Sequence, residues 1–364
     1  MKIIDITDYL ENIAPLSCQE EYDNSGLIIG NKNDCVSGIL ITLDCTEDVI
    51  DEAINKNCNL IISHHPIVFY GLKKFNGNNY VERIVIKAIK NSIAIYSIHT
   101  NLDNVINGVN SMIAKRIGLD EYKILSPKKE TLKYLVVYCP VADCDNLKKA
   151  LFNSGAGLIG NYDSCSFTSK GQGTFRANKG AMPAVGRIGE QHIEQEARIE
   201  VVFAKDRELD VLEAMQNNHP YEEIAYQIYT INNEDKMLGS GIIGKLKKPI
   251  NTKKFLQKLK IQMRTENIKH TKLIKDEIMN IAICGGSGSF LLEKAKDLDA
   301  DLFISSDFKY HQYFDADEKI IIADIGHYES EQFTKELIYD FLTKKFTRFA
   351  ILLSEINTNP IKNL

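Results

Sequence analysis

Apolar positions in the first part of the chain alternate between the spacing of strands and that of helices. Ser37–Leu43, Asn59–Ile62 and Ile93–Ile98 are short apolar runs with the length of buried strands. Thr46–Lys56 between them repeats apolar residues at helical spacing, and Val81–Lys90 is a second helix candidate. Strands that alternate with helices of this length predict parallel βαβ units.

The pattern changes near Ser126-Pro127, where strand and helix signals of a second kind begin. In chain order they are a strand at Leu132–Cys139, a helix at Asp143–Asn153, a stretch rich in Gly, Ser and Asn up to Gly189, a strand at Glu196–Phe203, a helix at Glu208–Asn217 and a strand at Ile224–Ile231. This order predicts a small ferredoxin-like α+β sheet.

After Gly239 the first pattern resumes. Its expected helices and strands are Thr252–Leu259, Ile278–Cys284, Phe290–Lys296, Leu302–Ile304, Ile320–Ala323 and Gln332–Phe346. We therefore expect one discontinuous α/β domain, made of residues 1–125 and 237–364, with an inserted α+β domain at residues 126–236. A chain of 364 residues has the length of two such domains.

Composition narrows the class of protein. Hydrophobic residues make up 44% and charged residues 26%, which is ordinary for a globular chain and excludes disordered and fibrous classes. A net charge of -5 shows no basic excess, so no nucleic-acid partner is expected. No apolar run approaches the ~20 residues that span a bilayer, and the N-terminus lacks the apolar core of a secretory signal. A cytoplasmic protein without a membrane partner is the expectation.

The eight cysteines are irregularly spaced and include no C-x-x-C pair. Such spacing in a chain of this length predicts reduced, mostly buried thiols and not a disulfide framework.

Histidines and carboxylates gather where predicted strands end. His64 and His65 directly follow one strand, His99 follows another with Asp103 four residues on, and His327 follows a third with Glu331 four residues on. Ligands of open α/β sheets bind at the carboxyl ends of the strands, so we expect all three groups on one rim of the sheet.

This combination of side chains favours metal binding. Imidazoles suit zinc, iron and manganese, and a carboxylate can bridge two ions. His327 and Glu331, at i and i+4 of a helix, share one face. Pro66 keeps the backbone at His65 out of the helical region, so a turn there can aim His64 and His65 at two neighbouring ions. A lone His-His pair is usually a surface feature; the joint occurrence at three strand ends is what favours a metal site.

The remaining signals are weaker. His192, His219 and His270 lack such partners and are assigned structural or surface roles. The loop Gly285–Ser289 lies between a strand and a helix without the Lys of a P-loop, so both a phosphate cradle and a tight turn stay open.

Taken together, several motifs resemble the NIF-three-like proteins, commonly described as GTP cyclohydrolase I type 2 homologues. The segments are Glu21–Gly30, Ser63–Phe69, His99–Asp103, Gly285–Gly288, Ser306–His311 and Gly326–Glu331, and in the insert Gly171–Gly189 and His219–Glu223, which resemble a CutA-like or PII-like module. The resemblance covers nearly the whole chain. One departure is Ser305-Ser306 before Asp307, where the family often has Thr-Gly; it bears on the loop that carries Asp307 and His311.

The resemblance implies a dinuclear site with two divalent ions, zinc, iron or manganese. Its metal ligands fall on His64, His65, Asp103, His327 and Glu331, and we expect Asp103 and Glu331 to bridge the ions. It also implies a homohexamer and a nucleotide-like, small-molecule substrate.

By resemblance, the reaction is hydrolytic. Hydroxide held by the metals would attack C8 of the guanine of GTP or a related nucleotide and release formate, with His99 or His311 as proton carrier. The alternative is a regulatory oligomer that senses a metal or ligand and in which the metals are structural. An open coordination position favours the enzyme, and closed coordination favours the sensor.

Overall fold

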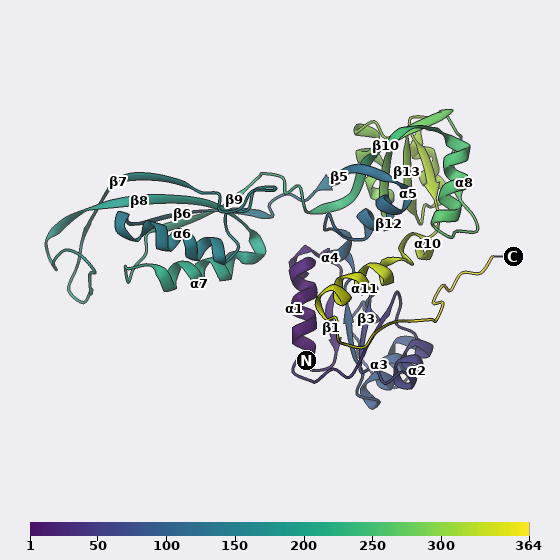
Figure 1. Cartoon of the computed structure of the whole chain (residues 1–364), viewed down its shortest axis with the longest axis horizontal. Helices are drawn as coiled ribbons and strands as arrows, with labels where there is room; N and C mark the ends of the chain where they lie inside the picture. Colours follow the sequence, from purple (N-terminus) through teal and green to yellow (C-terminus); the bar gives the residue numbers. More distant parts are fainter. Residues whose placement is uncertain (364) are drawn as a thin grey trace. The chain divides into compact units, whose positions relative to one another are not determined.

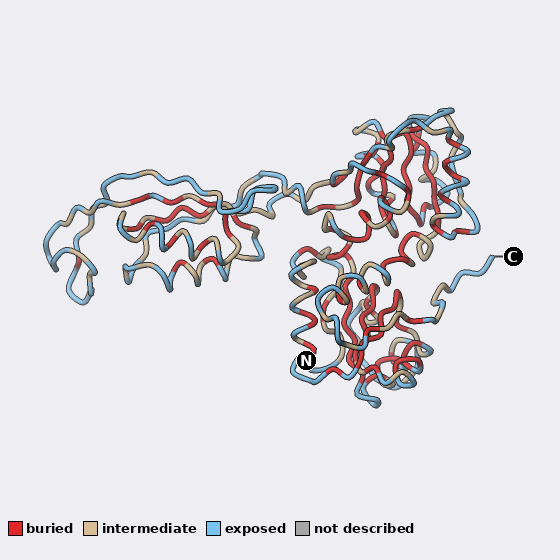
Figure 2. The backbone as a smooth tube through the Cα atoms, viewed as in Figure 1, coloured by how far each residue is buried: buried red, intermediate tan, exposed pale blue. Residues whose placement is uncertain are grey.

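The chain forms two compact units, each with its own buried interior. The computed structural model describes residues 1–363 and divides them into Met1–Ser126 with residues 237–363, and Pro127–Lys236 (Figures 1 and 2). Within residues 1–363, no helix combines the length and apolar character needed to cross a membrane. All eight cysteines are free thiols, and six of them are buried.

The first unit contains a five-stranded sheet in the order β1-β4-β3-β2-β15. Its strands are β1 (Gly26–Ile29), β2 (Ile39–Thr42), β3 (Leu60–Ser63), β4 (Ala94–Ser97) and β15 (Ile351–Leu353). β15, β2, β3 and β4 are parallel, and β1 is antiparallel to β4. The predicted βαβ units are therefore present in this half.

Two buried layers cover this sheet because its strands are apolar on both faces. Ile39 and Ile41 of β2 point into one core, and Leu40 between them points into the other, which contains α2 (Glu47–Asn55) and α3 (Tyr80–Lys90). Both helices begin at a capping side chain: Thr46 accepts from the amide of the third helical residue of α2, and Asn79 does the same for α3.

The first unit also contains a six-stranded sheet in the order β11-β14-β13-β12-β10-β5. Its strands are β5 (Leu119–Pro127), β10 (Gly239–Asn251), β11 (Lys269–His270), β12 (Glu277–Ser287), β13 (Leu302–Ser306) and β14 (Ile321–Asp324). β12, β13 and β14 are parallel, whereas β10 pairs antiparallel with β12 and β11 pairs antiparallel with β14. Helix α8 (Thr252–Gln262) belongs to this half (Figure 1), and α9 (Leu292–Asp297) packs against its strands.

The expectation of a single sheet rim is wrong. The strands after Gly239 build a sheet of their own, because β10 pairs antiparallel with β12 instead of extending the first sheet, and only β15 returns to β2. One buried cluster nevertheless joins the two sheets, with members from β2 and β14 and from α1 (Ile3–Ile13), α5 (Val109–Ile117) and α11 (Thr334–Lys345). Gly118 ends α5 in the left-handed conformation, as expected for a glycine C-cap.

The second unit is a four-stranded antiparallel sheet in the order β7-β8-β6-β9, with two helices on one face (Figure 1). Its elements are β6 (Leu132–Pro140), α6 (Cys144–Asn153), β7 (Phe167–Arg176), β8 (Gln191–Ala204), α7 (Glu208–Asn218) and β9 (Tyr226–Ile231). The order β-α-β-β-α-β is that of ferredoxin-like sheets. β7 lacks a sequence signal because it is an edge strand in which no position is buried.

The insertion leaves and re-enters through neighbouring strands, β5 and β10. We therefore predict that joining Ser126 to Met237 through a short Gly/Ser linker yields a protein that folds, because the three buried clusters of the first unit contain no residue of the insert and its two sheets keep all their strands. Chemical denaturation followed by circular dichroism should give one cooperative transition. A non-cooperative or aggregated product would show that the insert is part of the same folding unit.

Candidate metal centre

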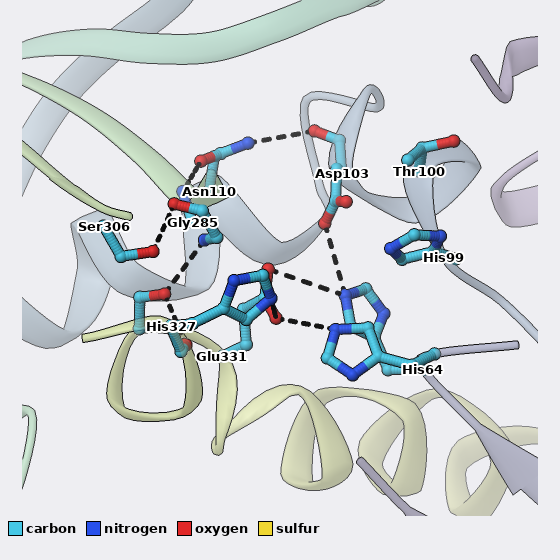
Figure 3. Close-up of polar contacts among 12 residues, drawn as sticks. His64, His99, Thr100, Asp103, Asn110, Gly285, Ser306, His327 and Glu331 are labelled. Atoms are coloured by element: carbon cyan, nitrogen blue, oxygen red, sulfur yellow. Dashed lines mark hydrogen bonds and ion pairs between the residues drawn. The ribbon is translucent and has the colours of Figure 1, made fainter. Parts of the chain in front are cut away.

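The carboxyl ends of strands from both sheets meet at one cluster of histidines and carboxylates (Figure 3). His64 and His65 follow β3, and His99 follows β4 and precedes the short helix α4 (Thr100–Asp103), which ends on Asp103. From the other sheet, β14 leads into α10 (His327–Glu331), whose first and last residues face the cluster. The structure thus brings together all five residues expected to bind metal.

Glu331 is the central group of the cluster. Its Oε2 atom lies 2.9 Å from Nε2 of His65 and 3.1 Å from Nε2 of His327, and its Oε1 atom lies 3.9 Å from Nε2 of His64. The carboxylate is 3% exposed, so these imidazoles and not water surround it. The i, i+4 spacing of His327 and Glu331 on α10 produces their contact, as expected.

Three sets of ligand atoms lie close enough to hold a metal ion. They are His64 with Asp103 and Glu331, His65 with His327 and Glu331, and His64 with His65 and His99. Glu331 belongs to two of these sets, so its two oxygens can serve two ions, whereas Asp103 belongs to one.

Each of the four histidines is oriented through its Nδ1 atom. His65 donates to Oδ1 of Asp44 at 2.7 Å, and His99 donates to Oδ1 of Asp23 at 2.7 Å. His64 and His327 are held in the same way, by the carbonyl oxygen of Ile98 at 2.8 Å and by Oδ2 of Asp307 at 2.6 Å. This pattern, in which a carboxylate or carbonyl fixes the tautomer and leaves Nε2 for the metal, is typical of metal-binding histidines.

Asp44 and Asp23 were not among the site residues expected from the sequence. Asp44 stands just beyond β2, at the same edge of the sheet as His64, so the strand-end rule that found the histidines applies to it as well. Asp23 lies inside the motif Glu21–Gly30 but carried no assigned role. The loop after Ser305-Ser306 gives Asp307 a left-handed backbone, with φ of 60°, and aims it at His327.

Burial and charge together set the protonation of the cluster. Burial lowers the pKa of His64 to about 3, so its Nε2 carries a free electron pair. Burial also acts to lower the pKa of His65 and His327, but their carboxylate partners outweigh it and raise these values to about 10 and about 11. Burial acts to raise the pKa of Glu331, yet the two imidazoliums hold it well below its usual range. A divalent ion bound between Glu331 and these imidazoles would displace the Nε2 protons of His65 and His327.

Two polar atoms of the cluster show that its residues fit a metal ion. His64 Nε2 and Asp103 Oδ1 are buried without a hydrogen-bond partner, and they lie 3.6 Å apart. Within residues 1–363 only five buried side-chain atoms lack a partner, and these two face one another. Unsatisfied buried polar atoms are costly, and an ion between them would satisfy both.

The Gly285–Ser289 segment packs against Glu331. Gly286 has φ of 62°, and a Cβ atom there would lie 2.3 Å from Oε1 of Glu331, so the close approach requires glycine. The amides of Gly285 and Gly286 donate to Asn110 Oδ1 and Ser330 Oγ, both at 2.9 Å. These two amides are therefore engaged within the protein and do not face an anion.

A cavity of about 220 Å³ lies beside the cluster. His99, Asp103, His327 and Glu331 form part of its wall, together with polar and aromatic side chains: Thr100, Asn104, Asn110, Ser240, Tyr22 and Phe290. A small molecule in this cavity would reach the ligand sets directly.

The other histidines lie elsewhere. His311, which was expected as a possible proton carrier, is exposed, and its ring lies against Tyr310 and Phe314 instead of in the ligand sets. His192 contacts Glu194, His219 Nε2 lies 2.8 Å from the carbonyl of Tyr138, and His270 is exposed.

Comparisons with known proteins agree with the motifs. Residues 1–360 match the family described as Duf34/NIF3 (NGG1p interacting factor 3). A curated relative from Bacillus subtilis (strain 168), named "GTP cyclohydrolase 1 type 2 homolog", is 37% identical over 98% of this chain and 96% of its own. A relative with the same name from Staphylococcus epidermidis is 36% identical, with both chains fully covered.

A solved structure is similar over the full length. The Bacillus cereus protein related to NIF3 is 34% identical, with a TM-score of 0.87 over 100% of this chain and 99% of its own. The names of the relatives record likeness and not a measured activity. The full-length match in sequence and the likeness in structure show that this chain belongs to the Duf34/NIF3 family.

Proposed function

We propose that this protein holds two divalent metal ions at the cluster around Glu331 and uses them to hydrolyse a nucleotide-like substrate. The observation that carries the proposal is the buried carboxylate of Glu331, with His65 and His327 at Oε2 and His64 facing Oε1. One ion would take His64, Asp103 and Glu331, and the other would take His65, His327 and Glu331. When bound, such a pair lowers the pKa of a water toward neutrality and stabilises charge on the attacked centre.

An enzyme is favoured over a sensor with structural metals. Each of these two ligand sets offers three side chains, and catalytic zinc sites use three protein ligands and keep one position open. The cavity against His327 and Glu331 gives a substrate access to that position. A structural site would be expected to supply four protein ligands.

His99 is the proposed proton carrier, because the two proposed ions take their ligands from the other two sets and leave its Nε2 atom free. Its Nδ1 atom is held by Asp23, its ring centroid lies 5.3 Å from those of both His64 and His65, and it lines the cavity. An imidazole so placed can take a proton from the attacking water and return it to the leaving atom. His311 has no comparable contact with the cluster.

The cavity wall supports a ring-bearing substrate. Tyr22 and Phe290, which are 65% and 68% exposed, are among the residues that line it. Aromatic rings stack on nucleobases. Ser240 also lines the wall, and its hydroxyl, which donates to Oδ1 of Asn104, can still accept a hydrogen bond. These features are compatible with the guanine of GTP, the substrate class that the family resemblance implies.

The second unit has a separate proposed role. As a CutA-like or PII-like module it would govern assembly or access to the metal centre, within the homohexamer that the resemblance implies. Sedimentation of the full chain and of the protein that lacks residues 127–236 tests this assignment; equal association states for both would contradict a role in assembly.

The shared position of Glu331 leads to a prediction about metal content. Glu331→Gln should lose both ions, because the amide offers only one weak ligand oxygen to either set. Asp103→Asn should lose one, because Asp103 belongs to a single set. Elemental analysis after reconstitution with zinc or manganese and gel filtration measures the stoichiometry.

A matched control is Glu336→Gln, which changes an exposed carboxylate on α11 that contacts Arg116. This variant should keep two ions per chain. Retention of both ions by Glu331→Gln would contradict the proposed centre. Loss of both ions in Asp103→Asn would show instead that Asp103 also bridges them.

The turnover rates of two variants show which of the two histidines, His99 or His311, carries the proton. With metal-loaded protein and a panel of nucleotides that includes GTP, product formation is followed by mass spectrometry. His99→Gln should lower turnover about 100-fold or more, the usual contribution of general acid–base catalysis. His311→Gln is the matched control. Its turnover should stay within about twofold of that of the unaltered protein, because His311 takes no part in proton transfer. A large effect of His311 and none of His99 would reverse the assignment, and no product from any nucleotide would contradict the substrate class.

A further inference from the structure

The last described residues cross from one sheet of the first unit to the other. After β15, which pairs with β2, residues 354–363 continue as an extended trace (yellow in Figure 1) without further regular structure. We call Ser354–Lys362 the C-terminal strap. None of its residues belongs to the ligand sets described above.

The strap is anchored at its start to the five-stranded sheet. The Ser354 amide donates to the carbonyl of Ile41 at 2.8 Å, and its hydroxyl donates to Glu52 Oε2 at 2.5 Å. The Glu355 amide donates to the other oxygen of Glu52 at 2.9 Å. Ser354 is 3% exposed, so this attachment is part of the interior.

Farther along, the strap contacts one residue that orients a metal ligand and another that lies on the helix carrying two of them. The Thr358 hydroxyl donates to Asp44 Oδ2 at 2.6 Å, while Oδ1 of the same carboxylate accepts from His65 Nδ1. The next residue, Asn359, donates to Glu329 Oε1 at 3.1 Å, and Glu329 lies on α10 between His327 and Glu331.

These contacts form one continuous chain of hydrogen bonds. It runs from Thr358 to Asp44 at 2.6 Å, from Asp44 to His65 at 2.7 Å, and from His65 to Glu331 at 2.9 Å. Two donors, one on each oxygen, fix the plane of the Asp44 carboxylate. Because Asp44 is 34% exposed, loss of the hydroxyl would free it to turn toward solvent and release the His65 ring.

We infer that Thr358 is a positioning residue for the metal centre and that the C-terminal strap clamps the two sheets so that His65 and Glu331 meet. The inference rests on the proposed metal centre. Groups that orient a metal-bound histidine through a hydrogen bond affect metal affinity although they do not touch the ion. Here the orienting group is itself oriented by the strap.

The test uses three variants of the full chain. Thr358→Val keeps the side-chain shape and removes the hydroxyl, and Thr358→Ser keeps the hydroxyl. Thr343→Val is the matched control, because it removes one similar hydrogen bond, from Thr343 to the carbonyl of Tyr339 within α11, and that bond involves no residue of the strap.

Two readouts separate positioning from general stability. Zinc and manganese titrations by calorimetry measure the affinity of each ion. In metal-free protein labelled with ¹⁵N-histidine, the exchange of the His65 Nδ1 proton with water reports the Asp44 contact; a His65→Gln variant assigns the signal among the eight histidines.

Thr358→Val should lower the affinity for one of the two ions about tenfold, which is the lower end of the effects measured for such supporting groups. It should also speed the exchange of the His65 Nδ1 proton with water. Thr358→Ser should restore the metal affinity and the slow proton exchange of the unaltered protein. Thr343→Val should leave both quantities unchanged. Unchanged exchange or unchanged affinity in Thr358→Val overturns the inference, as does the same loss in Thr343→Val. If the unaltered protein binds no ion, the proposed function fails, and the proton exchange in metal-free protein alone decides the role of Thr358.

Discussion

The contact between Glu331 and the imidazoles of His65 and His327 is the constraint on which the first unit depends. It places a carboxylate in the interior, where an unpaired charge is not tolerated, and it joins groups from two sheets. Removing one partner of such a buried pair typically costs about 3–5 kcal/mol. Three local features allow this contact. Gly286 leaves room for the Glu331 carboxylate, α10 places His327 and Glu331 on one face, and the turn after β3 carries His65 toward them.

The arrangement around this contact is more informative than the ligands alone. Asp44, Asp23 and Asp307 each accept a hydrogen bond from a histidine Nδ1 atom, and this turns the Nε2 atoms toward a common centre. A structural cluster of histidines would not need three carboxylates in this position. The orphaned atoms of His64 and Asp103 agree with this view, since both face the space that an ion would take. The chemistry of the donors suits imidazole- and oxygen-binding divalent ions.

Much of this site is visible in the sequence because it follows from local rules. His64, His99 and His327 were found because each follows an apolar strand, and the pairing of His327 with Glu331 follows from helical spacing.

The two-sheet arrangement was missed because strand pairing between β10 and β12 is a long-range choice that local periodicity does not encode. Asp44 obeys the same strand-end rule, but no histidine stands beside it in the sequence to single it out. Thr358 is joined to Asp44 only by the fold, since 314 residues separate them. Strand β7 has no apolar pattern that predicts it, because none of its positions is buried.

The central claim is that Glu331 is shared by two ions, and anomalous diffraction from crystals of the metal-loaded protein tests it most directly. Data collected on both sides of the metal absorption edge locate each ion independently of the protein phases. The account predicts two peaks about 3.5–4 Å apart, one beside each oxygen of Glu331, with His64 at one and His65 and His327 at the other. A single peak, or peaks that do not contact Glu331, would contradict it.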